Sequence, residues 1–326
     1  MRDIFTQWSL SFDQRRDFGS AQIDAHRFFI CGGHNSEKGP LRSCHVWDCE
    51  KNYDKRVKNL PNDGMAFCRA VCIDNYVYIL GSEKTFHRIN VEDTSKGWEE
   101  MAELSSPPGY GHDLVVCDKK IYQIGGKLQP SSVNCYDPAK NAWIENKSQL
   151  LKGRTDLTAV VVEESKEIYI IGGVTVPGNS VVRSVDIFSV RDKTLRSGPP
   201  LPNHSRDHSS FSAGKNGIFV IGGHVSGSQP PVTDILHLDT SSKKQTEWTF
   251  LKHKLPKPLI AHKTFATEFK VYVMGGVHDT KTKYNKEIYV CDLDALLGKR
   301  FREEEEELNH LEQNAPPPRK SFCFFC

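Results

Sequence analysis

The chain has 326 residues, of which 38% are hydrophobic and 26% are charged. This composition supports a folded core and excludes wholesale disorder. Lysine and arginine total 43 against 41 aspartate and glutamate residues, a formal net charge of +2, which argues against the strongly basic domains that bind nucleic acid. Acidic residues gather at the end of the chain, at Glu303–Glu307 and Glu312. The body is therefore mildly basic and could attract an anionic partner or its own tail, although a solvated surface explains the same imbalance.

Targeting signals and cysteine usage favour a cytoplasmic protein, with a nuclear location as an alternative. Residues 1–13 lack the apolar stretch of a secretory signal, and no run of about eighteen apolar residues predicts a membrane-spanning helix. Eight cysteines are scattered singly through the body, as expected of reduced thiols rather than of a disulfide framework. They are Cys31, Cys44, Cys49, Cys68, Cys72, Cys117, Cys135 and Cys291.

In chain order, the first predicted element is a strand over residues 4–10 that contains Trp8 and stands alone before a repeat begins. The repeat is an apolar run that ends in two glycines, and it occurs six times at intervals of 44 to 53 residues. In the second copy, Ser82 replaces the second glycine. The repeat glycines are Gly32, Gly33, Gly81, Gly125, Gly126, Gly172, Gly173, Gly222, Gly223, Gly275 and Gly276.

Each copy lies within a larger unit of four predicted strands. A short apolar segment precedes the Gly-Gly strand, and a polar loop and a third strand follow it, as at Val133–Asp137. A fourth strand often carries a tryptophan, at Trp98, Trp143 and Trp248. One such sheet cannot bury both faces alone, whereas copies arranged around an axis bury them against each other. Paired glycines permit the close backbone approach and positive φ that the end of the second strand would need.

The Gly-Gly strands, with a following Tyr136 and Trp143 in the third unit, resemble the kelch-repeat family. The resemblance covers roughly residues 1–295 and implies an all-β, six-bladed kelch-type β-propeller. It also implies that the strand at 4–10 completes the last blade and so closes the ring. We expect residues 296–326 to form an acidic helical and then proline-rich or disordered tail. Kelch domains often present substrates to ubiquitin ligases beside a BTB dimerisation domain, for which a repeat starting near residue 1 leaves no room.

The resemblance places one binding face at the loops that follow each Gly-Gly strand and precede each first strand. Basic and aromatic residues recur at these positions, and we predict that they bind a partner. Pairing with a neighbouring blade is the alternative explanation for each one, whereas together they suit a carboxylate-bearing or phosphorylated peptide. Titration of the histidines would weaken such binding as pH rises. The predicted partner-binding residues are His34, Arg69, Tyr110, His112, Arg154, Arg206, His208, His224, His262 and His278.

These features predict an intracellular interaction scaffold or substrate-recognition adaptor without cofactor, metal or catalytic residues. The alternative is a small-molecule enzyme, an isomerase or a metal-assisted lyase, that uses the propeller channel. The iron-binding Glu-x-x-x-Asp-x-x-x-His run of the related plant specifier proteins is absent from the sequence. No phosphate loop or nucleophile elbow occurs either.

The last four residues, from Cys323 to Cys326, have the form of a C-terminal prenylation box. Lipidation of Cys323 would place the protein at a membrane, although two phenylalanines and a terminal cysteine are unusual in that motif. An unstructured tail is the alternative, and both interpretations stay open.

Overall fold

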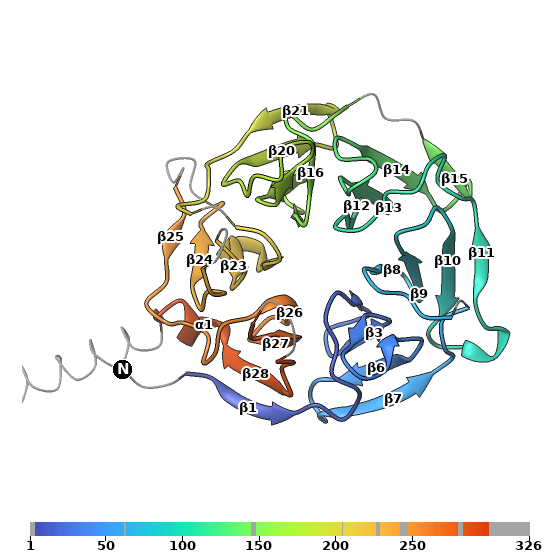
Figure 1. Cartoon of the computed structure of the whole chain (residues 1–326), viewed down its shortest axis with the longest axis horizontal. Coiled ribbons are helices and arrows are strands. Elements are labelled where there is room, and N and C mark those ends of the chain that lie inside the picture. The colour runs from blue at the N-terminus through green and yellow to red at the C-terminus, as the bar shows by residue number, and fades with distance from the viewer. Residues whose placement is uncertain are drawn as a thin grey trace, which may run out of the picture.

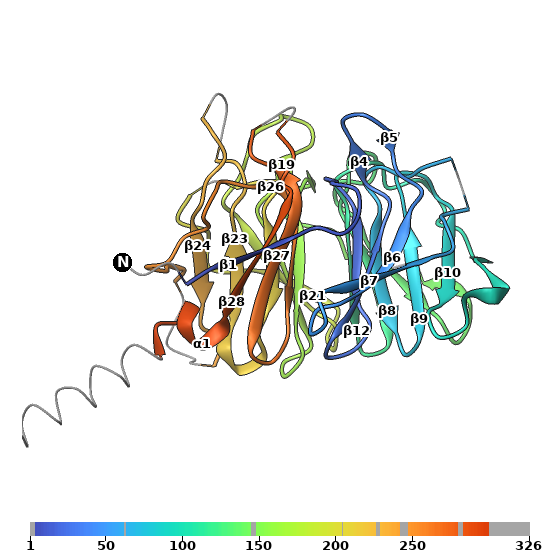
Figure 2. The same ribbon diagram turned by 90° about the horizontal axis from the view of Figure 1, so that it is seen from below.

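The computed structural model describes residues 4–61, 63–144, 148–203, 205–225, 229–241, 247–279 and 283–299. Six four-stranded sheets stand around a central axis as the blades of a propeller (Figure 1). Seen from the side, the strands near the axis run roughly along it, and loops gather at both ends of the ring (Figure 2). The chain is therefore an all-β, six-bladed propeller, as the sequence predicts.

Each blade is an antiparallel meander whose first strand is innermost. Blade 1 contains β2 (Gly19–Gln22), β3 (Arg27–Cys31), β6 (Cys44–Asp48) and β7 (Tyr53–Val57). Blade 2 contains β8 (Arg69–Ile73), β9 (Tyr76–Leu80), β10 (Phe86–Asn90) and β11 (Glu99–Met101). Blade 3 contains β12 (Asp113–Cys117), β13 (Lys120–Ile124), β14 (Val133–Asp137) and β15 (Ala142–Ile144).

Blades 4 to 6 repeat the arrangement. Blade 4 contains β17 (Thr158–Val162), β18 (Glu167–Ile171), β20 (Val185–Ser189) and β21 (Thr194–Ser197). Blade 5 contains β22 (Ser209–Ser212), β23 (Ile218–Ile221), β24 (Ile235–Leu238) and β25 (Thr249–Phe250). Blade 6 contains β26 (Ile260–Ala266), β27 (Lys270–Val277), β28 (Glu287–Asp292) and β1 (Thr6–Ser9). The loops add β4 (His34–Asn35) with β5 (Gly39–Pro40), β16 (Arg154–Thr155) with β19 (Val174–Thr175), and the 3-10 turns η1 (Thr94–Lys96) and η2 (Gly214–Asn216).

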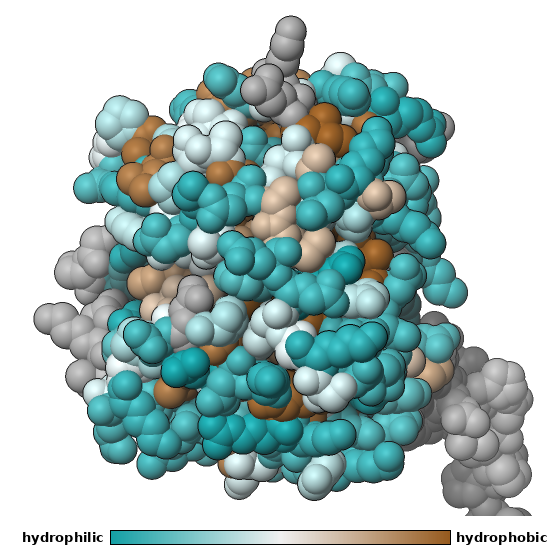
Figure 3. Space-filling view, turned by 90° about the vertical axis from the view of Figure 1, so that its right-hand side faces the viewer, coloured by the Kyte–Doolittle hydropathy of each residue, from teal (hydrophilic) through white to brown (hydrophobic). Residues whose placement is uncertain are grey.

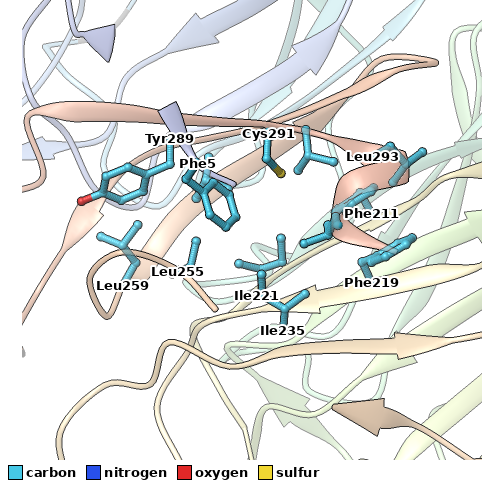
Figure 4. Close-up of a cluster of buried hydrophobic side chains, with 13 residues drawn as sticks. Phe5, Phe211, Phe219, Ile221, Ile235, Leu255, Leu259, Tyr289, Cys291 and Leu293 are labelled. Atoms are coloured by element: carbon cyan, nitrogen blue, oxygen red, sulfur yellow. The ribbon is translucent and has the colours of Figure 1, made fainter. Parts of the chain in front are cut away.

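The N-terminal strand closes the ring. β1 pairs antiparallel with β28, with Thr6 opposite Val290 and Trp8 opposite Ile288. Phe5, just before β1, is buried among side chains of blades 5 and 6 (Figure 4). The predicted closure by residues 4–10 is confirmed, and both ends of the propeller are held in one sheet.

Hydrophobic clusters lie between neighbouring blades. Each of the six interfaces has its own cluster of buried side chains. The cluster between blades 5 and 6 also contains Leu293 and Leu296 of the short helix α1 (Leu293–Leu296), which packs near Phe211 and Phe219 (Figure 4). Residues 300–326, including the glutamate run and Cys323, lie outside the described residues.

Tryptophan side chains on the outer strands add a repeated bond between blades. The indole N–H groups of Trp98, Trp143 and Trp248 donate to the backbone carbonyls of Asn59, Ala102 and Pro199, at 2.8 to 2.9 Å. Each acceptor belongs to the segment that leaves the preceding blade. These three tryptophans therefore attach the outer edges of blades 2, 3 and 5 to the preceding blade.

The Gly-Gly pairs form a second repeated link, which we call the glycine latch. In five blades the second glycine donates its amide to a carbonyl of the segment that enters the next blade, as from Gly173 to Ser205 at 2.7 Å. Both glycines of these pairs have positive φ, 59° and 98° at Gly172 and Gly173. Blade 2 differs: at Ser82 the bond is reversed, because the Ser82 carbonyl accepts from the amide of Gly109.

Candidate functional site at the channel mouth

The six innermost strands line a central channel that encloses about 380 Å³. Hydroxyl groups from four blades face it, and the Ser210 hydroxyl donates to Thr158 Oγ1 at 2.7 Å. Charged side chains lie among the lining residues where the strands enter the channel. They are Arg69, Asp113 and Lys263. This entrance is the end at which the predicted binding loops gather.

One residue near the start of each innermost strand has a positive φ, between 52° and 73°. The six residues are Asp17, Phe67, Gly111, Asp156, Asp207 and Ala261. Left-handed backbone is costly for residues other than glycine, and aspartate tolerates it better than phenylalanine or alanine does. Recurrence of this conformation in all six blades indicates that surrounding contacts impose it.

Backbone hydrogen bonds connect five of these six residues into an arc around the mouth. The backbone amide of Asp156 donates to the carbonyl of Gly111 at 2.8 Å, and the amide of Asp207 donates to the carbonyl of Asp156 at 3.3 Å. Ala261 donates to Asp207 at 2.9 Å, and Asp17 donates to Ala261 at 3.2 Å. Within the described part of the chain, no such bond joins Phe67 to Asp17 or to Gly111. This mouth arc therefore runs from blade 3 to blade 1 through blades 4, 5 and 6, and is interrupted at blade 2.

Charges at the mouth are arranged in pairs. Arg16 contacts Asp17 at 3.1 Å, Arg206 contacts Asp207 at 3.2 Å, and Arg69 Nε lies 3.4 Å from Asp113. Asp156 and Lys263 line a small hollow of the mouth together with members of these pairs. Four carboxylates thus face four cations, and the mouth is not a ring of hydrogen-bond donors alone.

Burial and mutual repulsion shift the pKa values of this cluster. Burial raises the pKa of Asp17 and of Asp156, against the opposing effect of nearby arginines. Burial, followed by the charges of Asp156 and Asp17, raises the pKa of Asp207 to about 7. Burial and the charge of Arg69 lower the pKa of Lys263 to about 8. The cluster therefore changes its proton content near neutral pH.

Five of the ten predicted partner-binding side chains are buried between blades. They are His112, Arg154, His208, His224 and His262. Arg154 Nη2 contacts Asp186 at 2.8 Å, and Nη1 donates to the carbonyls of Gly172 and Ser184. His208 lies between Thr158 and Ser205, 2.9 and 3.2 Å from their hydroxyls. These five side chains are interior groups rather than surface donors.

Burial also bears on the expected pH dependence. It is the main cause that lowers the pKa of His112, of His208 and of His262 to about 3. These imidazoles are neutral throughout the physiological range. These three histidines therefore do not supply the predicted loss of binding with rising pH, which stays a prediction for the partner-binding face.

The other five predicted residues are at least partly accessible, and they do not all lie together. His34 Nδ1 is 2.9 Å from the hydroxyl of Tyr284, and His278 Nδ1 is 2.9 Å from the carbonyl of Pro258. Arg206 belongs to blade 5, whereas Arg69 and Tyr110 lie at the entrances of blades 2 and 3. The structure thus brings Arg69 and Tyr110 to the interruption of the mouth arc and leaves the others elsewhere on the face.

An apolar group at this interruption was not predicted. The rings of Phe67 and Tyr110 lie 5.6 Å apart, and Tyr110 is 40% exposed. Leu128 is 64% exposed, and its amide donates to the Pro108 carbonyl in the same loop pair. We call Phe67, Tyr110 and Leu128 the aromatic shelf.

Two sequence signals could have revealed this layout. The dipeptide Arg-Asp precedes the first strand of two units, at Arg16-Asp17 and at Arg206-Asp207. It indicates paired charges rather than hydrogen-bond donors alone. Phe67 takes the place that aspartate or glycine holds in four other units. Within the described ranges, no group of three or more His, Cys, Asp and Glu side chains is arranged to hold a metal ion. Nor does any described helix have the length and apolar character to cross a membrane.

Comparison with known families supports the fold assignment. The model of the KLHDC2/KLHL20/DRC7 Kelch-repeats domain matches residues 111–326, about two-thirds of the chain. The match begins two residues before β12, so blades 3 to 5 and the first three strands of blade 6 fall within it. Among curated proteins, none matches the chain. The family match and the six-bladed ring show that this chain belongs to the family of the KLHDC2/KLHL20/DRC7 Kelch-repeats domain.

Proposed function

We propose that this kelch propeller is a protein-interaction module that docks a segment of a partner protein on the aromatic shelf, beside Arg69. Kelch-repeat propellers are generally protein-binding domains rather than enzymes. The observation that carries the proposal is an exposed apolar and aromatic group where the mouth arc is interrupted. Aromatic residues and arginine are enriched among the residues that dominate binding energy at protein interfaces.

The shelf and the charges beside it favour a partner segment that has both an apolar side chain and charged groups. An apolar side chain of the partner would pack on Tyr110 and Leu128, which would otherwise stay in water. The balanced charges of the mouth favour a segment that carries both a cation and a carboxylate over a purely acidic one. An adaptor role, in which the bound partner is presented to other proteins, is the finer part of this proposal.

Affinity capture from cell extract with quantitative mass spectrometry tests the proposal. The variant Tyr110→Ala/Leu128→Ala removes two exposed apolar side chains of the shelf. We expect it to lose one or a few proteins that the native chain captures, by about tenfold or more. The matched control Phe250→Ala/Phe269→Ala removes two exposed apolar side chains elsewhere, at 51% and 68% exposure, and should retain them. Equal capture by the native chain and the shelf variant would contradict the proposal.

A further inference from the structure

A second polar hollow lies on the outer edge of the ring, between blades 1 and 2 and away from the channel. It is open to solvent, has a volume of about 650 Å³, and lies between the end of β7 and the turn before β11. Four cationic side chains line it: Arg42, Arg56, Lys58 and Lys96. Trp98 and the segment 59–61 complete the wall. We call this site the basic hollow.

No carboxylate is among the described lining residues of the basic hollow. The one described carboxylate that pairs with any of the four cations is Asp63, a fully exposed residue 3.7 Å from Arg42. Asp93, close to Lys96 in sequence, accepts hydrogen bonds from the amide and hydroxyl of Ser95.

Other cations of the same two blades are paired closely. Lys38 with Asp13, Arg27 with Glu92, Lys84 with Glu103 and Arg88 with Glu99 all lie within 2.5 to 2.8 Å. Four like charges gathered around one hollow repel each other, and a bound anion would relieve that repulsion.

The arginines of the basic hollow are held in place by the chain itself. Arg42 Nη2 donates to the carbonyl of Leu60, and Arg56 Nη2 donates to the amide oxygen of Asn59, each at 3.2 Å. Each guanidinium keeps other N–H groups for a ligand, because it carries five. Positioned forks of this kind suit carboxylate and phosphoryl oxygens.

The wall opposite the arginines is fixed as well. Trp98 donates to the Asn59 carbonyl at 2.8 Å, and its ring meets Phe29 edge-on at 6.1 Å between centroids. Gly97 has no Cβ and so leaves room for the ammonium of Lys58. A Cβ added at residue 97 would lie 3.4 Å from Lys58 Nζ.

We propose that the basic hollow binds an acidic segment of a protein partner, at a site independent of the aromatic shelf. The cations come from two blades and surround an open space larger than one phosphate group. A chain that carries several negative groups in succession therefore fits the hollow better than a single free ion. Carboxylates and phosphoryl groups share the required chemistry, and the ligand peptides below distinguish them.

Fluorescence anisotropy with the full-length chain and two labelled peptides tests the proposal. One peptide has six glutamates, and the other has three phosphoserines separated by glycines. We expect the native chain to bind at least one of them, with an affinity that falls as salt rises. The variant Lys58→Gln/Lys96→Gln should bind about five- to tenfold more weakly, because it loses two of four exposed charge contacts. The peptide that binds more tightly identifies carboxylate or phosphoryl as the preferred group.

Lys140→Gln/Lys252→Gln is the matched control, since it removes the same charge from exposed positions outside the basic hollow. It should bind like the native chain, as should Tyr110→Ala/Leu128→Ala, which keeps this result separate from the proposed function. Equal weakening by both lysine variants would show attraction by overall charge and overturn the proposal. Failure of both peptides to bind, or hollow-dependent binding of oligothymidylate alone, would overturn it too.

Discussion

Blade 2 and the other five blades share one strand order but contact their neighbours differently. The other five donate a glycine latch to the next blade, whereas blade 2 has Ser82 and a reversed bond. In this interface the Gly109 carbonyl lies 3.0 Å from Nδ1 of the buried His112 instead. Blade 2 is also where the mouth arc is interrupted and where Phe67 replaces an arc residue. The blade that departs from the repeated contacts is thus the one beside the exposed aromatic shelf.

The comparison teaches that the exposed aromatic group of the mouth lies where the backbone bonds of the arc are missing. Along the mouth arc, where the entry segment of one blade bonds to that of the next, the arc positions are held by aspartate, glycine or alanine. Where those bonds are missing, aromatic side chains reach the surface. Substitutions in the regularly bonded blades should therefore lower stability, whereas substitutions at the aromatic shelf should weaken binding. The following variants test the stability half of this separation.

The largest expected effect concerns Arg154 in blade 4, which holds the position that Met65 holds in blade 2. Arg154→Met alone leaves Asp186 buried without its partner and should lower the free energy of unfolding by about 3–5 kcal/mol. Burial lowers the pKa of Arg154 and raises that of Asp186, so desolvation opposes the charged pair. Arg154→Met/Asp186→Leu should therefore recover most of the loss in urea unfolding. A single variant as stable as the native chain would refute this account.

The glycine latch predicts the next largest difference. Gly223→Ser would place a Cβ 2.8 Å from His208 Cβ in a backbone with φ of 99°, and should cost about 3 kcal/mol of unfolding free energy. Ser82→Gly in blade 2 should change it by less than about 0.5 kcal/mol, because the reversed bond uses the Ser82 carbonyl and not its side chain. Thermal unfolding of both variants measures the contrast. Similar losses at the two sites would mean that blade 2 is held like the others.

A smaller, pH-dependent effect is expected at Asp207. Its folded-state pKa of about 7 exceeds the ordinary value, so the folded chain binds more protons than the unfolded chain between about pH 4 and 7. The protonated group therefore stabilises the fold at low pH, and that contribution is lost as pH rises through 7. Asp207→Asn imitates the protonated form and should raise stability by at least about 1 kcal/mol more at pH 8 than at pH 5. Equal effects at both pH values would contradict the assigned pKa.

Most of the fold could be predicted because its signals are local and repeated. Gly-Gly pairs such as Gly172-Gly173 follow the second strand of their units, and tryptophans such as Trp143 mark the fourth strand. The strand with Trp8 stood outside every unit, and the last unit lacked a fourth strand, so pairing beside β28 was predictable. The candidate site was less predictable, since burial at the mouth depends on side chains from neighbouring blades. His208 was expected at the surface, but it packs between Thr158 and Ser205. Sequence spacing gives no measure of that enclosure.

The aromatic shelf depends on a departure from the repeat, which periodicity alone does not reveal. Phe67 adopts the positive φ of the arc residues without joining the arc, so its ring reaches Tyr110 on the adjoining loop. The outer face over blades 2 and 3, by contrast, is mainly hydrophilic with small apolar patches (Figure 3). Contacts of this kind become visible only when the backbone path of two loops is known.

Site-specific photo-crosslinking tests the central claim most directly. A benzoylphenylalanine residue would replace Tyr110 on the shelf in one protein and Phe269 in another. Phe269 is 68% exposed in the β26–β27 turn, at the opposite end of the channel. Irradiation in cell extract should give a discrete crosslinked partner from position 110 and none from position 269. A partner crosslinked only from position 269, or none from position 110 while a captured partner is present, would contradict the claim that proteins dock at the mouth beside blade 2.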